Sequence, residues 1–387
     1  MDKRYGAWAF GLTAWLAMLI SPLAAKADDG TIVVAVPAKA GSVDGRQENS
    51  DQFMWQQFIT ATTPSSVKGK VEFETWASDL DTFAADPKWP AADAPKRLHG
   101  SMLENIKNPH LGAIDVPCAT PGNAGVGGFP STGCIAEETR RNRPQFDYIV
   151  QNKLYSRAGL KQAFQDPAFT VAMPLSSLAV KVDWVPVATV SQWIPYETVE
   201  RVRQDYYTTT VNSVEYALVS MHLSSRQNPN WVWATFEHYL TPGRCDFIGC
   251  SDTFGAAKAV VAPQRNTVNS QYGYCDKTAA LVNMMNARQV APVWRNYCLK
   301  SSEVDYAAAD GTPYVLGNSV IEGITGNGTV AASSCIACHA YASFGRDGSP
   351  ESSVTAMLPF NPIGKPVPGV LAQSRLYDFM WGLLFAK

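Results

Sequence analysis

The stretch 214-VEYALVSMHLSSRQNPNWVWATFEHYL-240 predicts a β-hairpin near the middle of this 387-residue chain. Apolar and polar residues alternate in its two runs, which is the pattern of half-buried strands. Between the runs, residues 227–230 (QNPN) favour a turn. Further strand-like runs lie at 31–38, 71–77 and 178–187. These runs predict a large β-rich part built around the hairpin.

Three other segments have the periodicity of amphipathic helices. Apolar residues recur every three or four positions over 51–59, 146–165 and 277–287. The predicted fold class is α+β, with a large β-rich N-terminal part that contains a few helices. A C-terminal segment of helix and loop follows it.

The C-terminal stretch 333-SSCIACHAYASF-344 carries the most specific chemical pattern in the chain. Cys335 and Cys338 are followed directly by His339, which is the CxxCH pattern of covalent haem attachment. Two thioether bonds need two sulfurs on one side of a single helical turn, and positions i and i+3 supply them. The next residue then offers one ring nitrogen to the iron, while the other donates to a carbonyl. Ser333 and Ser334 are expected to cap this turn.

Two other kinds of site use closely spaced cysteines. A structural zinc site needs four ligands, usually with a second close pair, and no such pair occurs in the sequence. A thioredoxin-like redox pair would follow a strand of a βαβ unit, which the residues before the motif do not predict. Covalent haem is the favoured interpretation. A redox dithiol, a metal site and a plain disulfide remain the alternatives.

Cys335, Cys338 and His339 match the haem-binding segment of c-type cytochromes, which the segment 312–387 resembles. That resemblance implies one covalent haem c and electron transfer. A second resemblance, to a family of exported bacterial cytochrome c-like proteins, rests on stretches spread over the mature chain: VEFETWAS, SLAVKVDW, YALVSMHLSS, NWVWATFEH, APVWRNYCLK, LGNSVIEG and YDFMWGLLF. It implies that the haem-binding segment packs as one unit with the β-rich domain, 28–311. The sequence departs from this family's pattern in 55–64 and after His238.

The second axial position of the haem iron is often filled by a Met that lies C-terminal to the motif. Met357 lies in the irregular stretch 354-VTAMLPFNP-362 and is the candidate sixth ligand. Met380 lies in an apolar run and fits core packing better. A distant His and an open position are the alternatives.

The hairpin also carries His222 and His238, with Glu237 beside the second. If the turn centres near Asn228, His238 faces about Leu218, which lies about 13 Å along the strand from His222. The two rings then cannot share one small metal ion. Each is interpreted as a hydrogen-bonded structural histidine, with haem contact or substrate binding as the alternative.

Residues 1–27 have the three parts of a signal peptide. A short basic start precedes an apolar run over about 7–20, and 25-AKA-27 fits the cleavage pattern. The run is shorter than the roughly 20 residues that span a bilayer, which favours cleavage over a retained anchor. The mature protein is expected in the periplasm, with no membrane span after the signal is removed.

The six cysteines outside the motif are expected to pair in that oxidising compartment. The favoured pairs each close a local loop: Cys118–Cys134, Cys245–Cys250 and Cys275–Cys298. A nested arrangement of the four central cysteines is the alternative.

A net charge of −2 at pH 7 offers no electrostatic footprint for nucleic acid, so the expected partners are redox proteins of the periplasm. The favoured function is that of a periplasmic monohaem c-type cytochrome. The alternative is a haem-dependent oxidoreductase with an open iron site and a substrate pocket in the β-rich part. Trp231, Trp233 and Trp381 would line that pocket, although core packing is favoured for each. A haem sensor, or a protein whose haem is structural, is the third interpretation.

Overall fold

The computed structural model describes residues 48–100, 135–194, 197–261, 272–322, 330, 333–351 and 362–387. All of them belong to the compact unit Val36–Lys387. Several predicted features lie outside the described residues: the signal peptide, the run at 31–38, the pair Cys118–Cys134 and Met357.

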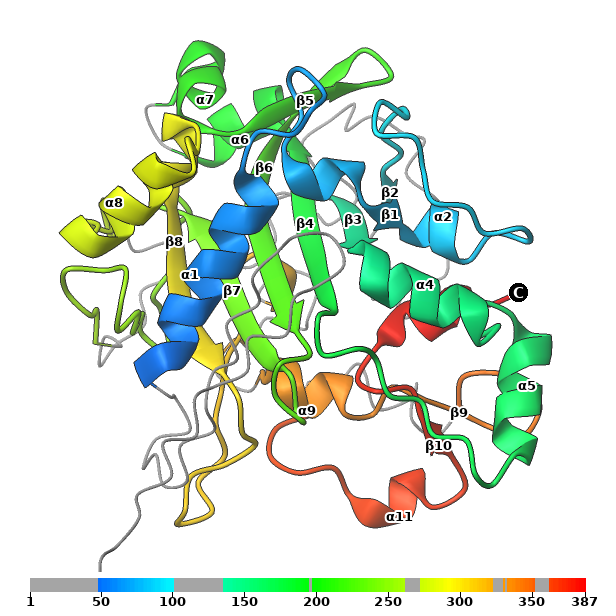
Figure 1. Ribbon diagram of the computed structural model, residues 1–387. Coiled ribbons are helices and arrows are strands. Elements are labelled where there is room, and N and C mark those ends of the chain that lie inside the picture. The colour runs from blue at the N-terminus through cyan, green and yellow to red at the C-terminus, as the bar shows by residue number, and fades with distance from the viewer. Residues whose placement is uncertain are drawn as a thin grey trace, which may run out of the picture. The chain divides into compact units, whose positions relative to one another are not determined.

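An antiparallel sheet of eight strands forms the centre of the described chain, and its main path has the order β1-β3-β4-β6-β7-β8 (Figure 1). β2 pairs with β3, and β5 pairs with β6. The strands are β1 (Ala77–Ser78), β2 (His99–Gly100), β3 (Ala136–Arg141), β4 (Leu178–Pro186), β5 (Thr208–Val211), β6 (Val214–Ser225), β7 (Val232–His238) and β8 (Tyr297–Glu303). Two short strands, β9 (Ser343–Phe344) and β10 (Arg375–Leu376), pair separately. The predicted α+β class with a β-rich part is confirmed.

Short helices connect and cover these strands. The α-helices are α1 (Glu48–Thr62), α2 (Asp79–Thr82), α4 (Arg143–Gln151), α5 (Arg157–Gln165), α6 (Val187–Trp193), α7 (Val199–Asp205), α8 (Ala279–Ala287), α9 (Cys335–His339) and α11 (Pro368–Leu371). The 3-10 helices are η1 (Glu72–Thr75), η3 (Pro292–Asn296) and η7 (Trp381–Phe385). The helices predicted over 51–59 and 277–287 are confirmed as α1 and α8.

Two local predictions are wrong. The segment 146–165 forms two helices, α4 and α5, because the chain turns between them with Lys153 in the left-handed region at φ 57°. Gly159 permits this turn, since a Cβ there would lie 1.9 Å from the Lys153 carbonyl oxygen. The strand predicted over 71–77 is mostly η1, whose first turn closes when the Val71 N–H donates to Glu74 Oε2 at 2.9 Å.

One face of the sheet is apolar and is covered by α1, with α8 beside it (Figure 1). Trp55 and Phe58 of α1 pack on Phe236 of β7, with ring centroids 5.0 and 4.5 Å away. The strands direct a set of buried apolar side chains to this face: Val180, Val182, Leu218, Met221, Leu223 and Ala234. Burial of such side chains contributes roughly 1.5–3 kcal/mol each, so this face is the main core.

The opposite face is polar, and we call it the polar face. Residues directly opposite each other in the ladder share a face of the sheet. The observed register therefore groups Glu137 of β3, Lys181 and Asp183 of β4, Ser220 and His222 of β6, and Thr235 and Glu237 of β7. Most of these groups are buried, which means that another part of the chain covers them.

The polar face is covered by the segment 316–322. Asn318 Nδ2 donates to Thr235 Oγ1 at 2.7 Å, and the Ser319 N–H donates to Glu237 Oε1 at 3.0 Å. Lys300 of β8 forms a buried ion pair with Glu237 at 2.7 Å and donates to the Gly317 carbonyl at 2.9 Å. These bonds satisfy polar groups that would otherwise be costly to bury.

The C-terminal part of the chain packs against α4 and α5. Ile336, Phe344 and Tyr377 share one apolar cluster with Leu154 and Leu160. The Tyr377 hydroxyl also donates to the Leu154 carbonyl at 2.9 Å. Residues more than 150 positions apart in sequence thus form a second core.

Two of the predicted disulfides are confirmed, Cys245–Cys250 and Cys275–Cys298. The nested alternative for these four cysteines is wrong. Their Cα atoms are 5.2 and 5.9 Å apart, within the usual range for a disulfide.

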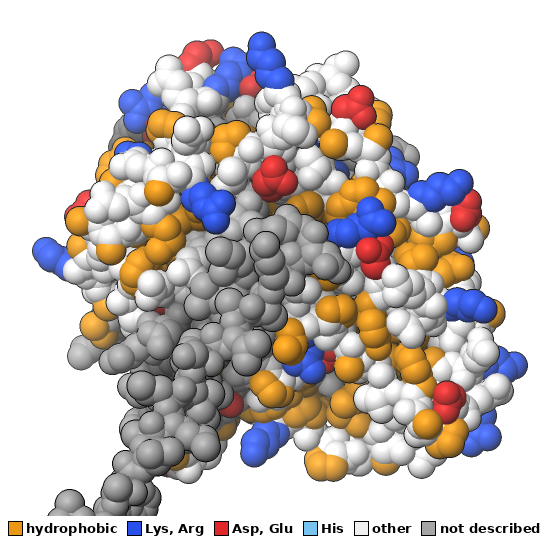
Figure 2. Space-filling view, viewed as in Figure 1, with side chains coloured by type: hydrophobic (Ala, Val, Ile, Leu, Met, Phe, Trp, Pro, Cys, Tyr) orange, Lys and Arg blue, Asp and Glu red, His pale blue; other side chains and the backbone are white. Residues whose placement is uncertain are grey.

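On the face drawn in Figure 2, Lys and Arg side chains stand apart from one another among acidic and apolar ones. This mixture agrees with the near-neutral net charge. In the described part of the chain, no helix has both the length and the apolar character that crossing a bilayer requires.

Candidate functional site

The CxxCH motif forms the short helix α9, Cys335–His339, at the end of the sheet where β8 finishes (Figure 1). Ser334 is its N-cap, and its Oγ accepts from the Ala337 N–H at 3.2 Å. Glu303, the last residue of β8, accepts from Ser334 Oγ at 2.7 Å and from the Ile336 N–H at 3.2 Å. The helix thus begins here because a side chain and a strand end satisfy its first amides.

The two motif cysteines lie on this single turn, Cys335 buried and Cys338 half-buried. No disulfide joins them. Cys335 Sγ lies 3.6 Å from the Leu316 carbonyl oxygen and 4.0 Å from His222 Nδ1. Burial raises the pKa of Cys335 well above its usual value, so the sulfur is a neutral thiol. The pair has the spacing that two thioether bonds require.

His339 has the hydrogen bond expected of a proximal iron ligand. Its Nδ1 lies 2.7 Å from the carbonyl oxygen of Phe379. Because a carbonyl oxygen can only accept, Nδ1 carries the ring proton and the lone pair is on Nε2. Removal from water lowers the pKa of His339 to about 4, so the ring is neutral at pH 7. A neutral imidazole with its lone pair on Nε2 is the form that binds iron.

Two of the predicted tryptophans contact the motif. The Trp233 ring centroid lies 4.4 Å from that of His339, and Trp381 Nε1 donates to the Cys338 carbonyl at 3.2 Å. Trp231 is fully buried, and its Nε1 donates to Asp378 Oδ1 at 3.3 Å. Trp233 Nε1 also donates a hydrogen bond to the Asn230 carbonyl. Trp231 and Trp233 are core residues, as the favoured interpretation had it, and Trp233 additionally forms a wall of the site.

His222 and Glu322 form a polar pair beside Cys335. His222 Nε2 lies 3.4 Å from Glu322 Oε1, and Glu322 Oε2 accepts from the Asn318 N–H. Burial alone would raise the pKa of Glu322, but His222 and the Asn318 amide outweigh it and lower that pKa to about 2. Sequence reasoning did not assign Glu322 to the site. The alternation along β6 places His222 on the polar face, but alternation does not identify a partner 100 residues away.

His238 lies elsewhere and is structural. Its ring stacks on Tyr206 at 3.5 Å, its Nε2 lies 2.8 Å from the Asp205 carbonyl, and its Nδ1 accepts from the Leu240 N–H. The predicted register is wrong by one residue, because Ser220 pairs with Glu237 and Met221 with Phe236. His238 consequently lies on the opposite face of the sheet from His222, so the conclusion that they share no metal ion stands.

We expect His238 to make the fold sensitive to acid. Burial lowers its pKa to about 3, below the ordinary value of about 6.5, so the unfolded chain binds one more proton between these values. This contribution to stability is present above pH 6.5 and is lost as pH falls, by up to about 1.4 kcal/mol per pH unit. Urea unfolding of the protein between pH 7 and 4 measures it. In His238→Gln, the dependence of the unfolding free energy on pH should become weaker by the contribution of one proton. Tyr239→Phe should keep the dependence of the unchanged protein, and an unchanged dependence in His238→Gln would contradict the prediction.

Met380 is buried and follows Phe379, whose carbonyl holds the Nδ1 side of the His339 ring. Its side chain belongs to the same apolar cluster as Ile336, Phe344 and Tyr377. The core interpretation of Met380 is therefore supported. Of the two other histidines whose side chains are described, His222 is near the motif and His238 is not.

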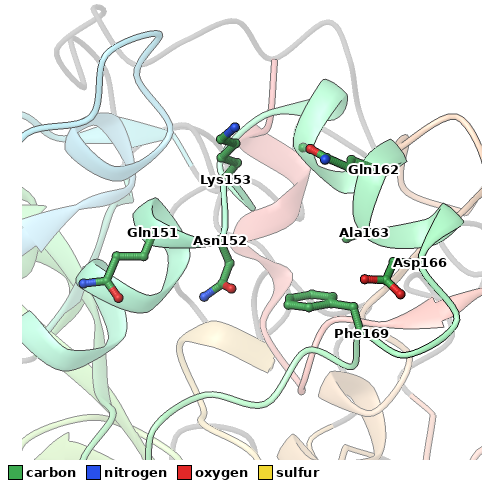
Figure 3. A pocket seen from close by; sticks show the side chains of 8 residues that line it. Gln151, Asn152, Lys153, Gln162, Ala163, Asp166 and Phe169 are labelled. Carbon is green, nitrogen blue, oxygen red and sulfur yellow. The ribbon is translucent and has the colours of Figure 1, made fainter.

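Neither a metal cluster nor the surface hollow of the described residues involves the motif. Within the residues that the structure covers, no group of three or more His, Cys, Asp or Glu side chains is arranged to hold a metal ion. A surface hollow of about 240 Å³ lies between α4 and α5, as Figure 3 shows. It is lined mainly by amide and charged side chains, and none of the motif residues contributes: Gln151, Asn152, Lys153, Gly159, Gln162, Ala163, Asp166 and Phe169.

Comparison with known proteins finds no match among family models, curated proteins or solved structures. The assignment of the site accordingly depends on the geometry of its own residues. The most informative part of that geometry is the bond between His339 and Phe379, two residues 40 positions apart in sequence.

Proposed function

We propose that this chain is a periplasmic monohaem c-type cytochrome that transfers electrons through one haem c. Cys335 and Cys338 would hold the haem by thioether bonds, and His339 Nε2 would bind its iron. The observation that carries the proposal is the His339 Nδ1 bond to the Phe379 carbonyl at 2.7 Å, on the same turn that presents both sulfurs. When bound, the haem supplies a reversible one-electron couple.

The surrounding residues have clear roles under this proposal. Phe379 orients the His339 ring and increases the basicity of Nε2. Trp233 and Trp381 keep water away from the ring and from the end of α9. Glu303 and Ser334 hold the start of α9, which keeps the two sulfurs on one turn.

The proposed periplasmic location is supported by the residues 1–27 and by the disulfides. Cys245–Cys250 and Cys275–Cys298 are of the kind that forms in oxidising compartments. The partners would be redox proteins of the periplasm.

A second function, that of a haem-dependent oxidoreductase, is favoured by one observation. His222 and Glu322 place an acid–base pair beside Cys335, and small-molecule chemistry at an open iron would need such groups. The two functions differ in whether the second axial position of the iron is filled, for which Met357 is the proposed ligand.

Mass and visible spectra test the proposal. Protein made in a host with cytochrome c assembly should gain the mass of one haem and show a low-spin ferrous spectrum that does not respond to carbon monoxide. Met357→Ala should lose low-spin character, while the matched change Met380→Ala should keep it. A high-spin ferrous form that binds carbon monoxide would favour the oxidoreductase. A colourless protein with the mass of bare polypeptide would rule out both functions.

A further inference from the structure

Asp183 lies in the middle of the polar face and is 1% exposed. Across the ladder it faces Glu137 on β3 and Ser220 on β6. Its neighbour on β4, Lys181, pairs with Glu137 Oε1 at 2.9 Å, so the nearest cation is engaged by the other carboxylate.

The hydrogen bonds around Asp183 suit a neutral acid better than a carboxylate. Oδ2 accepts from Ser220 Oγ at 3.0 Å, whereas the buried Oδ1 has no partner among the described residues. A buried carboxylate with one donor and a second carboxylate opposite it is strongly disfavoured. Burial first, and then the charge of Glu137, raise the pKa of Asp183 well above its usual value, which Lys181 and Ser220 only partly offset.

The polar face connects Asp183 to the CxxCH motif. His222 is two residues beyond Ser220 on β6, on the same face, and its Nδ1 lies 4.0 Å from Cys335 Sγ. Two pairs flank Asp183: the ion pair of Glu137 with Lys181, and the polar pair of His222 with Glu322. Of the polar and charged groups on β3, β4, β6 and the segment 316–322, those that act on Asp183 are Glu137, Lys181, Ser220 and Glu322.

Protons can reach the polar groups around Asp183 from the solvent. The side chains of Lys181, His222 and Glu322 are 24%, 15% and 20% exposed, while that of Glu137 is 3% exposed. These polar groups are therefore in contact with solvent at Lys181 and at the His222–Glu322 pair, whereas Asp183 is buried between them.

We propose that Asp183 is a proton-binding site coupled to electron transfer. It would take one proton from water when the haem held by α9 gains an electron from the redox partner, and would return it on oxidation. The proposal rests on the function proposed above. Its physical reason is that an added negative charge in a poorly screened interior favours the protonated form of a nearby acid. A change of about tenfold in the acid dissociation constant of Asp183 between the two redox states is expected.

Potentiometric titration of the haem-loaded protein at a series of pH values tests this proposal. The midpoint potential should fall as pH rises through the window between the pKa of Asp183 in the oxidised protein and its pKa in the reduced protein. Redox-difference infrared spectra should show a carboxylic acid C=O band that changes in that window. In Asp183→Asn, which mimics the neutral acid in shape, the band should be absent and the potential independent of pH there.

Glu215→Gln is the matched control, because Glu215 lies on the same strand, β6, but in an exposed pair with Arg203. It should behave as the unchanged protein does. A haem-loaded protein whose potential does not vary with pH, or an Asp183→Asn variant that keeps the variation, would overturn the inference while leaving the cytochrome function intact. A chain that gains no haem mass overturns the cytochrome function itself, and the inference with it.

Discussion

Replacing Cys335 and Cys338 together by serine is expected to give an exported protein with the mass of bare polypeptide and no haem absorbance after extraction with acidified acetone. A serine oxygen does not add to a haem vinyl group under the conditions in which a thiol does, so neither of the two proposed covalent bonds would form. Each single variant should keep one bond and retain haem through extraction, since Cys335 and Cys338 occupy separate positions on α9.

The matched control removes two other cysteines. Cys275→Ser with Cys298→Ser opens a disulfide that closes a loop of 23 positions, and the chain-entropy relation sets its cost at about 3 kcal/mol. That variant should be less stable but should still carry covalent haem. If the double variant at 335 and 338 kept the haem mass, the attachment site would have to lie elsewhere in the chain.

Lys300→Met is expected to destabilise the fold by about 3–5 kcal/mol, because it removes the ion-pair partner of the buried Glu237 carboxylate. Lys300 is 1% exposed and Glu237 is 0% exposed. Lys300 also donates to the Gly317 carbonyl and to Ser319 Oγ, and Glu237 accepts from the Ser319 N–H. The substitution therefore weakens the attachment of the segment that covers the polar face.

Denaturant unfolding at pH 7 measures this effect. Arg203→Met provides the comparison, because the Arg203–Glu215 pair has the same 2.7 Å separation but side chains that are 50% and 30% exposed. Such a pair contributes about 0–1 kcal/mol. Lys300→Met combined with Glu237→Leu should recover much of the loss, since two apolar groups leave no charge buried. A cost under 1 kcal/mol for Lys300→Met alone would contradict the structural role assigned to the pair.

The positions of α9, His222 and Glu322 depend on this same attachment. Glu322 follows the bonded residues 317–319, and Leu316 forms a parallel bridge with Ser334, the cap of α9. A change at Lys300 is thus expected to disturb the site without touching the motif. If the proposed haem is present, the denaturant titration of Lys300→Met should show this disturbance as an early loss of low-spin absorbance.

Periodicity of apolar residues in the sequence predicts much of the fold. The hairpin, the strand over 178–187 and the helices α1 and α8 follow from periodicity. The observed register differs from the predicted one by one residue, because Trp231 adopts the left-handed region at φ 62° after the turn, and turn type decides register. The periodicity of 146–165 predicts one helix, because it does not reveal a turn that depends on a close approach between Gly159 and Lys153.

The sequence by itself determined the elements that neighbouring residues control: strand alternation, helix periodicity, two local disulfides, and the CxxCH turn that presents Cys335, Cys338 and His339. Only the tertiary structure decided which distant groups complete that turn, namely Glu303, the Phe379 carbonyl, Trp233 and the His222–Glu322 pair. The physical reason is that backbone geometry relates residues a few positions apart, whereas the partners of a buried polar group are set by which faces of the sheet are covered, and by what.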